Sequence, residues 1–319
     1  MADSFYSLTP ERVLEATERA GSRTTGLCYP LMSLENRVYE LELEGGERRV
    51  SKFYRPGRWS KEAILDEHAL LLALSEHDIP VAAPLRLADG ATVATTEEGI
   101  HFATFPKVGG RSPDELPDGE LEQVGRLLAR VHNVSASMRL EHRPAISPKT
   151  YGRQALERLL ASPRLSPSAA PRLEDATSNL LRLCEERFAS VSTFAIHGDC
   201  HRGNLLRGRA GYFLVDFDDM GHGPAVQDIW LLLPARLRDC PAALESFLRG
   251  YEQFRPLDRR ELPLVEALRA LRYLRYAAWI ASRLEDPAFR QTFADFGSER
   301  YWQQLGQDLY EQVGQLQVA

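Results

Sequence analysis

The chain has 319 residues, 44% of them hydrophobic and 26% charged, a composition that excludes a disordered, collagen-like or coiled-coil protein. At roughly 100 to 200 residues per domain, this length predicts two domains or one two-lobed unit. The 39 Lys and Arg residues against 45 Asp and Glu residues give a net charge of −6. That balance argues against a general nucleic-acid binder, because such proteins need a broad excess of basic residues.

Cysteine usage and hydropathy indicate where the protein works. The four cysteines lie far apart and form no Cys-x-x-Cys pair, so neither a zinc knuckle nor a disulfide framework is indicated. No window approaches the roughly 18 uncharged apolar residues of a membrane span, and the first residues lack the basic and apolar regions of a secretion signal. We therefore expect a cytoplasmic protein without a membrane partner.

The first elements along the chain predict a helix and a β-hairpin. Thr9 followed by Pro10 has the chemistry of a helix start, and that helix is expected to end at Gly21. Residues 37–54 alternate polar and apolar side chains on either side of a Gly-Gly pair, which is typical of a β-hairpin.

The next segments predict a second helix, a further strand and a boundary between lobes. Ser60 can cap the helix, and residues 100–105 predict the strand. Residues 106–110 then break every regular period, and the chain beyond them is mostly helical. We therefore predict an N-lobe at residues 1–107 and a C-lobe at residues 108–319.

Two short strand-like segments interrupt the helical C-lobe, at residues 194–196 and 212–215, and each ends in a polar cluster. From residue 225 onward the pattern is helical again. Residues 139–172 are locally basic, with seven Lys or Arg residues against two acidic ones. A solvated surface is the favoured interpretation of this stretch, and docking of an acidic substrate is the alternative.

The densest polar cluster follows the segment at 194–196. It runs from His197 to Asn204, and another polar cluster begins at Asp216. If the glycines between the two clusters turn the chain, Asn204 and Asp216 flank one hairpin. Their amide and carboxylate oxygens would then suit a Mg²⁺ ion whose coordination is completed by nucleotide phosphates. Asp199 would then stand beside the metal site as a general base for an attacking hydroxyl.

Two other interpretations of this cluster remain open. A motif this short also occurs as a polar surface turn. A zinc hydrolase using His197, Asp199 and His201 is a second possibility, since imidazole and carboxylate are good zinc ligands. The zinc interpretation explains neither Asn204 nor the acidic residues at 216–219.

A buried ion pair is predicted in the N-lobe. Lys52 lies mid-strand on the same face as Val50, where an apolar side chain would be expected. Glu67 falls on the apolar stripe of the helix after Ser60, and a carboxylate there needs a partner. Pairing Lys52 with Glu67 satisfies both and positions the lysine to reach phosphate. A purely structural salt bridge is the alternative.

The entry to the hairpin is the last candidate for phosphate binding. Residues 32–39 pass through small and polar side chains, so Ser33 and neighbouring backbone N–H groups could face phosphates. Taken alone, this segment would be an ordinary turn.

The order and spacing of these features resemble the protein-kinase-like superfamily. Within it, His197-Gly198-Asp199-x-His201-x-x-Asn204 is similar to the aminoglycoside phosphotransferase and choline kinase branch. That resemblance implies an α+β, bilobal protein-kinase-like fold with a small antiparallel-sheet N-lobe and a larger, mainly helical C-lobe. It also implies Asp199 as catalytic base, Asn204 and Asp216 as magnesium ligands, and Lys52 on the α and β phosphates of ATP.

Further runs resemble the bacterial stress response kinase A (YihE) family and span nearly the whole chain: Ser33 to Tyr39, Lys52 to Pro56, Pro80 to Pro84, Val108 to Arg111, His142 to Pro144 and Gly223 to Asp228. This resemblance implies a cytoplasmic, monomeric Ser/Thr protein kinase with a role in envelope or oxidative stress. It places Ser33 near the ATP phosphates and gives Asp228 the role of bracing the catalytic loop.

Some positions depart from eukaryotic-type kinases. No Gly-x-Gly-x-x-Gly precedes Lys52, Asp218 replaces the glycine that follows Asp-Phe, and no Ala-Pro-Glu segment follows, so control by a phosphorylated activation loop is in doubt. His201 stands where those kinases have a lysine, so we expect it to contact the γ-phosphate, and the sequence leaves its charge open.

The sequence therefore predicts transfer of the γ-phosphoryl of Mg-ATP to a Ser or Thr hydroxyl of a protein, the chain itself included. The alternatives are a small-molecule kinase for an amino alcohol or sugar, a non-catalytic nucleotide-binding scaffold, and the zinc hydrolase. No nucleic-acid partner is expected.

Overall fold

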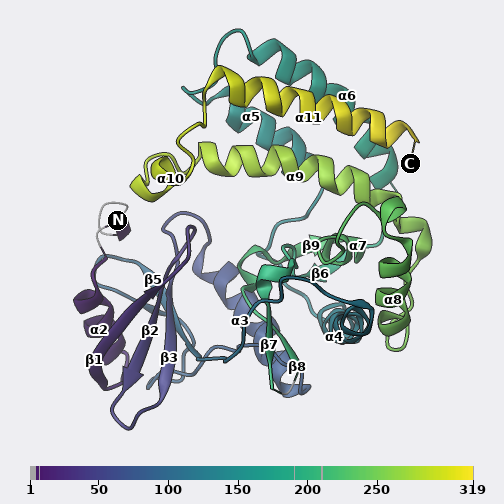
Figure 1. Cartoon of the computed structure of the whole chain (residues 1–319). Helices are drawn as coiled ribbons and strands as arrows, with labels where there is room; N and C mark the ends of the chain where they lie inside the picture. Colours follow the sequence, from purple (N-terminus) through teal and green to yellow (C-terminus); the bar gives the residue numbers. More distant parts are fainter. Residues whose placement is uncertain (1–4, 7, 190, 210, 319) are drawn as a thin grey trace. The chain divides into compact units, whose positions relative to one another are not determined.

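The computed structural model (Figure 1) describes residues 5–6, 8–189, 191–209 and 211–318. The chain divides into two compact units. The first comprises Met1–Arg143, Asp199–Met220 and Leu233–Pro256, and the second comprises Pro144–Gly198, Gly221–Leu232 and Leu257–Ala319. Each unit is assembled from three separated stretches of chain. The division into lobes after residue 107 stays a prediction.

A five-stranded antiparallel sheet begins the first unit. In spatial order its strands are β1 (Thr24–Leu31), β2 (Arg37–Leu43), β3 (Arg48–Phe53), β5 (His101–Pro106) and β4 (Ala94–Thr95). The hairpin and the later strand expected from the sequence are confirmed as β2–β3 and β5. The sequence pattern does not predict β1, because this edge strand contains Pro30 and an irregular register between Thr24 and Cys28.

The two faces of this sheet have different partners. On one face Tyr39, Leu41 and Phe53 form a buried cluster with Val13 of α2 (Pro10–Arg19), the helix that begins at the expected cap Thr9. The other face carries Lys52, and the register places Val38 of β2 and Ala103 of β5 on either side of it. The sheet therefore has a hydrophobic side for the core and a side that holds the lysine.

The helix α3 (Lys61–Glu76) follows β3. The Ser60 hydroxyl accepts a hydrogen bond from Ala63 N at 3.2 Å, as expected for its cap. The buried stripe of α3 contains Glu67 and His68 among apolar residues. The helix thus presents one carboxylate and one imidazole to the interior.

The helices α4 (Asp118–Ser135) and α8 (Pro241–Tyr251) pack closely together in the first unit. A Cβ atom at Gly125 would lie 2.2 Å from Phe247 O, and one at Gly250 would lie 1.9 Å from Glu122 O. The absence of side chains at these two positions lets the backbones approach.

A small hairpin in the first unit joins β7 (Leu205–Gly208) to β8 (Gly211–Leu214). Both of its edges are held by other segments. Arg207 exchanges backbone hydrogen bonds with Arg111 at 2.9 and 3.3 Å, and Leu214 N donates to Pro80 O at 3.1 Å. The hairpin is therefore fixed to the chain just beyond β5 on one side and to the segment after α3 on the other.

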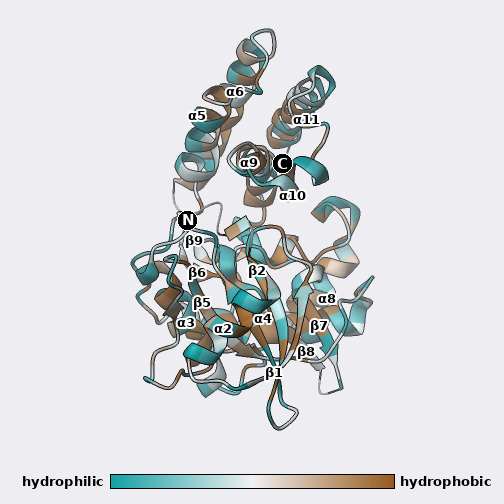
Figure 2. Ribbon diagram, turned by 90° about the vertical axis from the view of Figure 1, so that its left-hand side faces the viewer, coloured by the Kyte–Doolittle hydropathy of each residue, from teal (hydrophilic) through white to brown (hydrophobic). Residues whose placement is uncertain are grey.

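The second unit is mainly helical. Its regular elements are α5 (Gln154–Leu160), α6 (Ala170–Phe188), β6 (Phe194–Ile196), β9 (Gly221–Gly223), α7 (Val226–Trp230), α9 (Leu264–Ala281), α10 (Pro287–Thr292) and α11 (Glu299–Val318). β6 pairs antiparallel with β9, and α9 and α11 share a core with α5 and α6 that includes Leu180, Leu271 and Leu309. Figure 2 shows both hydrophobic and hydrophilic residues along these helices, as expected of helices with one buried side.

The remaining short helical segments are the π-helix η1 (Pro148–Arg153) and the 3₁₀ helices η2 (Arg202–Asn204), η3 (Phe217–Asp219), η4 (Leu237–Asp239) and η5 (Arg259–Glu261). The α+β class and the antiparallel sheet predicted from the sequence are confirmed. Among the described residues, no helix combines the length and apolar character needed to cross a membrane.

Candidate active site

Lys52 lies at the centre of a group of carboxylates. Its side chain is 9% exposed, and its Nζ atom lies 3.2 Å from Glu67 Oε1, 3.0 Å from Asp218 Oδ1 and 3.5 Å from Asp216 Oδ1. Burial alone would lower the pKa of Lys52, but the charges of Asp218 and Glu67 hold that pKa well above its usual value. The ammonium therefore stays charged, and the predicted ion pair with Glu67 is present.

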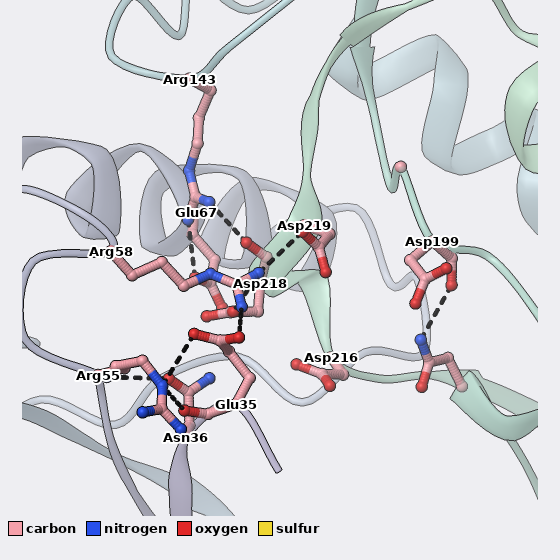
Figure 3. A network of polar contacts seen from close by, with 12 residues as sticks. Glu35, Asn36, Arg55, Arg58, Glu67, Arg143, Asp199, Asp216, Asp218 and Asp219 are labelled. Atoms are coloured by element: carbon pink, nitrogen blue, oxygen red, sulfur yellow. Dashed lines mark hydrogen bonds and ion pairs between the residues drawn. The ribbon is translucent and has the colours of Figure 1, made fainter. Parts of the chain in front are cut away.

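Glu67 is held from a second side by Arg143. Arg143 Nη2 donates to Glu67 Oε2 at 2.9 Å, Nη1 donates to Asp218 O at 2.8 Å, and Nε donates to Ala63 O at 2.8 Å (Figure 3). The Arg143 side chain is fully buried. Lys52, Glu67, Arg143 and Asp218 thus form a closed ring of contacts that links the sheet, α3 and the segment after β8.

The loop after β6 carries Asp199. The backbone N–H groups of His197 and Gly198 each donate to a different oxygen of Asp228 at 2.8 Å, so Asp228 braces the loop as expected. Asn204 Nδ2 donates to Asp199 O at 2.9 Å. Backbone contacts therefore fix where Asp199 lies.

His201 contacts the predicted base. Its Nδ1 atom accepts a hydrogen bond from Gly203 N at 3.0 Å, so in the neutral ring the proton lies on Nε2. That Nε2 atom lies 3.4 Å from Asp199 Oδ2. The structure thus brings His201 to Asp199, and a contact with the γ-phosphate stays a prediction.

Asn204 and Asp216 flank the β7–β8 hairpin, as the sequence predicts. Leu205 pairs with Leu214, and Val215 N donates to Asn204 O at 3.0 Å, so the two side chains emerge at the same end. Asp216 adopts a left-handed conformation with φ 60° and ψ 65°, which costs a non-glycine residue about 1–2 kcal/mol. Its side chain is 58% exposed.

The donor atoms at this end suit a hard divalent cation. The Asn204 amide nitrogen is used by Asp199 O, which leaves the amide oxygen for a metal, and Asp216 adds a carboxylate. Among the described residues, no group of three or more His, Cys, Asp or Glu side chains is arranged to hold a metal ion. The alternative zinc site of His197, Asp199 and His201 therefore has no geometric support. The two oxygen ligands Asn204 and Asp216 instead suit a Mg²⁺ ion whose coordination is completed by phosphates.

Ser33 lies in the turn between β1 and β2 and is half-buried. In the part of the chain that the structure describes, we find no hydrogen bond made by its hydroxyl. Its place beside the phosphates stays a prediction.

The sequence interpretation missed Arg58 and Arg143 as parts of this site. Both side chains are almost completely buried against carboxylates that come from distant segments. Neither arginine lies in a periodic segment whose pattern would reveal its burial. The only available signal for Arg143 is the His-Arg-Pro run noted in the family resemblance.

A lysine paired with a helical glutamate, beside a hairpin with Asp and Asn at its base, is the arrangement of a kinase-like phosphotransferase. Residues 30–268 match the phosphotransferase enzyme family, and the chain belongs to this family. It is 37% identical to stress response kinase A of Escherichia coli (strain K12), over 99% of this chain and 96% of that protein. It is also 37% identical to serine/threonine protein kinase RdoA of Salmonella typhimurium (strain LT2), over 98% and 94%.

Solved structures resemble the fold over nearly the whole chain. Amicoumacin kinase hAmiN in complex with AMP-PNP, Ca²⁺ and Ami aligns with a TM-score of 0.76 at 20% identity, covering 97% of this chain and 96% of that one. The microcompartment-associated aminopropanol kinase aligns with a TM-score of 0.69 at 22% identity, covering 92% and 98%. These likenesses establish a protein-kinase-like phosphotransferase fold.

Proposed function

We propose that this phosphotransferase is a cytoplasmic, monomeric Ser/Thr protein kinase of a bacterial stress response, with Mg-ATP as phosphoryl donor. The observation that carries the proposal is the approach of Lys52 Nζ to Asp216 Oδ1 at 3.5 Å, across 164 positions of the chain. It places the predicted phosphate-binding lysine beside the predicted metal ligand. The name of one relative, serine/threonine protein kinase RdoA, supports a protein acceptor, and the name of the other, stress response kinase A, supports a role in a stress response.

The nucleotide is expected on the lysine-bearing face of the sheet. The register pairs Val50 with Phe105, two residues along from Lys52 and Ala103, so both apolar side chains lie on that face. Val50 and Phe105 would cover the adenine, and Lys52 would bind the α and β phosphates while Glu67 orients its ammonium. Amicoumacin kinase hAmiN, which has a similar fold, was solved in complex with AMP-PNP, and this supports the binding of a nucleotide.

Asn204 and Asp216 would hold Mg²⁺ against the phosphates. The bound ion would supply positive charge that neutralises the charge developing on the phosphoryl oxygens. Asp216 is oriented for this by its left-handed backbone and by Lys52 at its side.

Asp199 would accept the proton of the acceptor. As the hydroxyl oxygen forms its bond to the γ-phosphorus, the bond from that phosphorus to the β–γ bridging oxygen breaks and its electrons leave with ADP. The hydroxyl proton passes to the Asp199 carboxylate. His201 Nε2 lies 3.4 Å from that carboxylate, and Asp228 accepts a hydrogen bond from the backbone N–H of Gly198, the residue before Asp199.

The test is phosphoryl transfer by the purified chain. Incubation with Mg-ATP and a generic protein substrate, in parallel with a panel of amino alcohols and sugars, is followed by mass spectrometry of each acceptor and of the chain itself. Phosphoserine or phosphothreonine on protein is the expected result. Transfer to a metabolite alone would establish the small-molecule kinase instead, and ATP binding without any transfer would indicate the scaffold.

A further inference from the structure

One guanidinium joins two segments that the proposed function places around the triphosphate. Arg58 lies in the turn between β3 and α3, and its side chain is 6% exposed. Arg58 Nη1 lies 2.8 Å from Glu35 Oε2. Arg58 Nη2 lies 3.0 Å from Asp218 Oδ2 and 2.8 Å from Asp219 Oδ1. Figure 3 shows Glu35, Arg58 and the two aspartates in one continuous group.

On one side, Arg58 holds a loop that is already stiff. Arg55 Nε donates to Glu35 O at 2.9 Å, and Arg55 Nη2 donates to Leu34 O at 2.9 Å. The backbone N–H of Arg55 donates to Asn36 Oδ1 at 3.1 Å. The residues after Ser33 therefore form a loop fixed by charge and by hydrogen bonds, in a chain that has no glycine-rich loop at this place.

On the other side, Arg58 holds the segment that follows the metal ligand. Asp218 lies two residues after Asp216, and its Oδ1 atom lies 3.0 Å from Lys52 Nζ. The Asp218 side chain is 5% exposed. A buried carboxylate between two cations can move only with them, so the position of Arg58 also bears on Lys52.

We propose that Arg58 is a positioning residue for the triphosphate: it sets the separation between the loop of Ser33 and the segment of Asp216. The inference rests on the proposed function, which places a bound triphosphate between these two segments. The fork of a guanidinium can satisfy Glu35 with one nitrogen and the aspartates with the other. A lysine has a single charged nitrogen and cannot bridge both sides.

The experiment compares Arg58→Lys with the wild type. Steady-state rates give kcat and the KM for Mg-ATP, calorimetry gives the affinity for Mg-ATP, and thermal unfolding reports on stability. We expect the KM to rise about tenfold while kcat changes less than about threefold, because Asp199 and its loop are untouched. Arg23→Lys is the matched control: Arg23 is 87% exposed and 4.0 Å from its partner Glu44, so no change is expected.

A double-mutant cycle tests the bridge itself. Glu35→Gln should raise the KM for Mg-ATP in the same way, and combining it with Arg58→Lys should add little further. If Arg58→Lys fails to fold, Glu35→Gln probes the same link from the loop. Unchanged affinity for Mg-ATP in these variants, or a loss of thermal stability alone, would overturn the inference. A wild-type chain without phosphoryl transfer would count against the proposed function instead.

Discussion

At the scale of single residues, the proposed base Asp199 is the group whose role a single substitution can test most directly. Asp199 O accepts hydrogen bonds from Asn204 Nδ2 and from His201 N, both at 2.9 Å, and these two bonds involve the backbone oxygen of Asp199 and not its carboxylate. Asp199→Asn should keep this geometry and remove only the proton acceptor. We expect turnover to fall about 10²- to 10⁴-fold while Mg-ATP affinity stays within about twofold. Steady-state rates and calorimetry measure the two effects, and wild-type turnover would remove Asp199 from the role of base.

A buried histidine makes the stability of the fold depend on pH. His68 is 1% exposed and lies 2.9 Å from Tyr54 Oη and 2.8 Å from Thr92 Oγ1. Burial, with the charges of Lys52 and Arg143, lowers the pKa of His68 from 6.5 to about 3. The unfolded chain therefore takes up a proton below about pH 6.5, and the folded chain does not until about pH 3. Stability is thus lost as the pH falls through this window.

The measurement is denaturant unfolding at pH 6.5 and at pH 5. At about 1.4 kcal/mol per pH unit, His68 should account for about 2 kcal/mol of the loss between these values. His68→Gln, which does not titrate, should be less stable at pH 6.5 but should show a correspondingly smaller loss. An equal pH dependence in the variant and the wild type would contradict the assignment.

The polar residues of the site differ in how far the sequence predicts them. Glu67 can be predicted to pair with Lys52, because a carboxylate on the apolar stripe of a helix requires a cation. Arg58 and Arg143 cannot be predicted in the same way, since their burial arises only when remote segments close around them. A charged residue that interrupts a local apolar pattern can therefore be predicted from the sequence, whereas a charged residue that is buried only by remote segments cannot.

At the scale of elements, the contact between α4 and α8 depends on two glycines. A Cβ at Gly250 would lie 1.9 Å from Glu122 O and 2.8 Å from Glu122 C, both backbone atoms that cannot move without the helix. Gly250→Ala should therefore force α8 away from α4 and destabilise the first unit by about 1–3 kcal/mol. Thermal or denaturant unfolding measures the change.

Gly314→Ala in α11 is the matched control. No atom lies within 4 Å of a Cβ built at Gly314, and the residue is exposed. Alanine there should stabilise the helix by about 0.5–1 kcal/mol, since glycine costs conformational entropy in a helix interior. Stabilisation by alanine at both positions would show that helix propensity, and not close packing, decides the outcome at Gly250.

Elements with regular patterns are predicted by the sequence, and the edge strand is not. The caps at Thr9 and Ser60 and the alternation in residues 37–54 mark α2, α3 and the β2–β3 hairpin, all confirmed. The sequence pattern does not predict β1, because Gly26 and Pro30 interrupt it and much of it is exposed on both faces. An edge strand needs no continuous apolar face, so its pattern is weak.

At the scale of the whole molecule, the residues proposed to act on ATP come from separate stretches of chain and fall in one compact unit. Lys52 and Glu67 belong to its first stretch, and Asp199, Asn204 and Asp216 belong to its second. This unit is compact because segments that are separate in the sequence meet, and the lobe boundary after residue 107 stays a prediction. The proposed chemistry requires that these two stretches come into contact, and Lys52 Nζ does lie 3.5 Å from Asp216 Oδ1.

Binding of nucleotide between Lys52 and Asp216 should therefore stabilise the folded state. A ligand that binds only the folded state raises the free energy of unfolding by about 2.7 kcal/mol at about one hundred times its Kd. We expect Mg-ATP to raise the free energy of unfolding by such an amount, and ATP with excess EDTA to raise it much less. The reason is that Asn204 and Asp216 are proposed to bind the phosphates through the metal ion. In Asp216→Asn, Mg-ATP and ATP with EDTA should stabilise the fold to the same extent. Asparagine tolerates the left-handed backbone at this position, so the substitution itself should not strain the chain. Thermal unfolding with each ligand measures this. A variant that keeps the full magnesium-dependent shift would show that Asp216 is not a metal ligand.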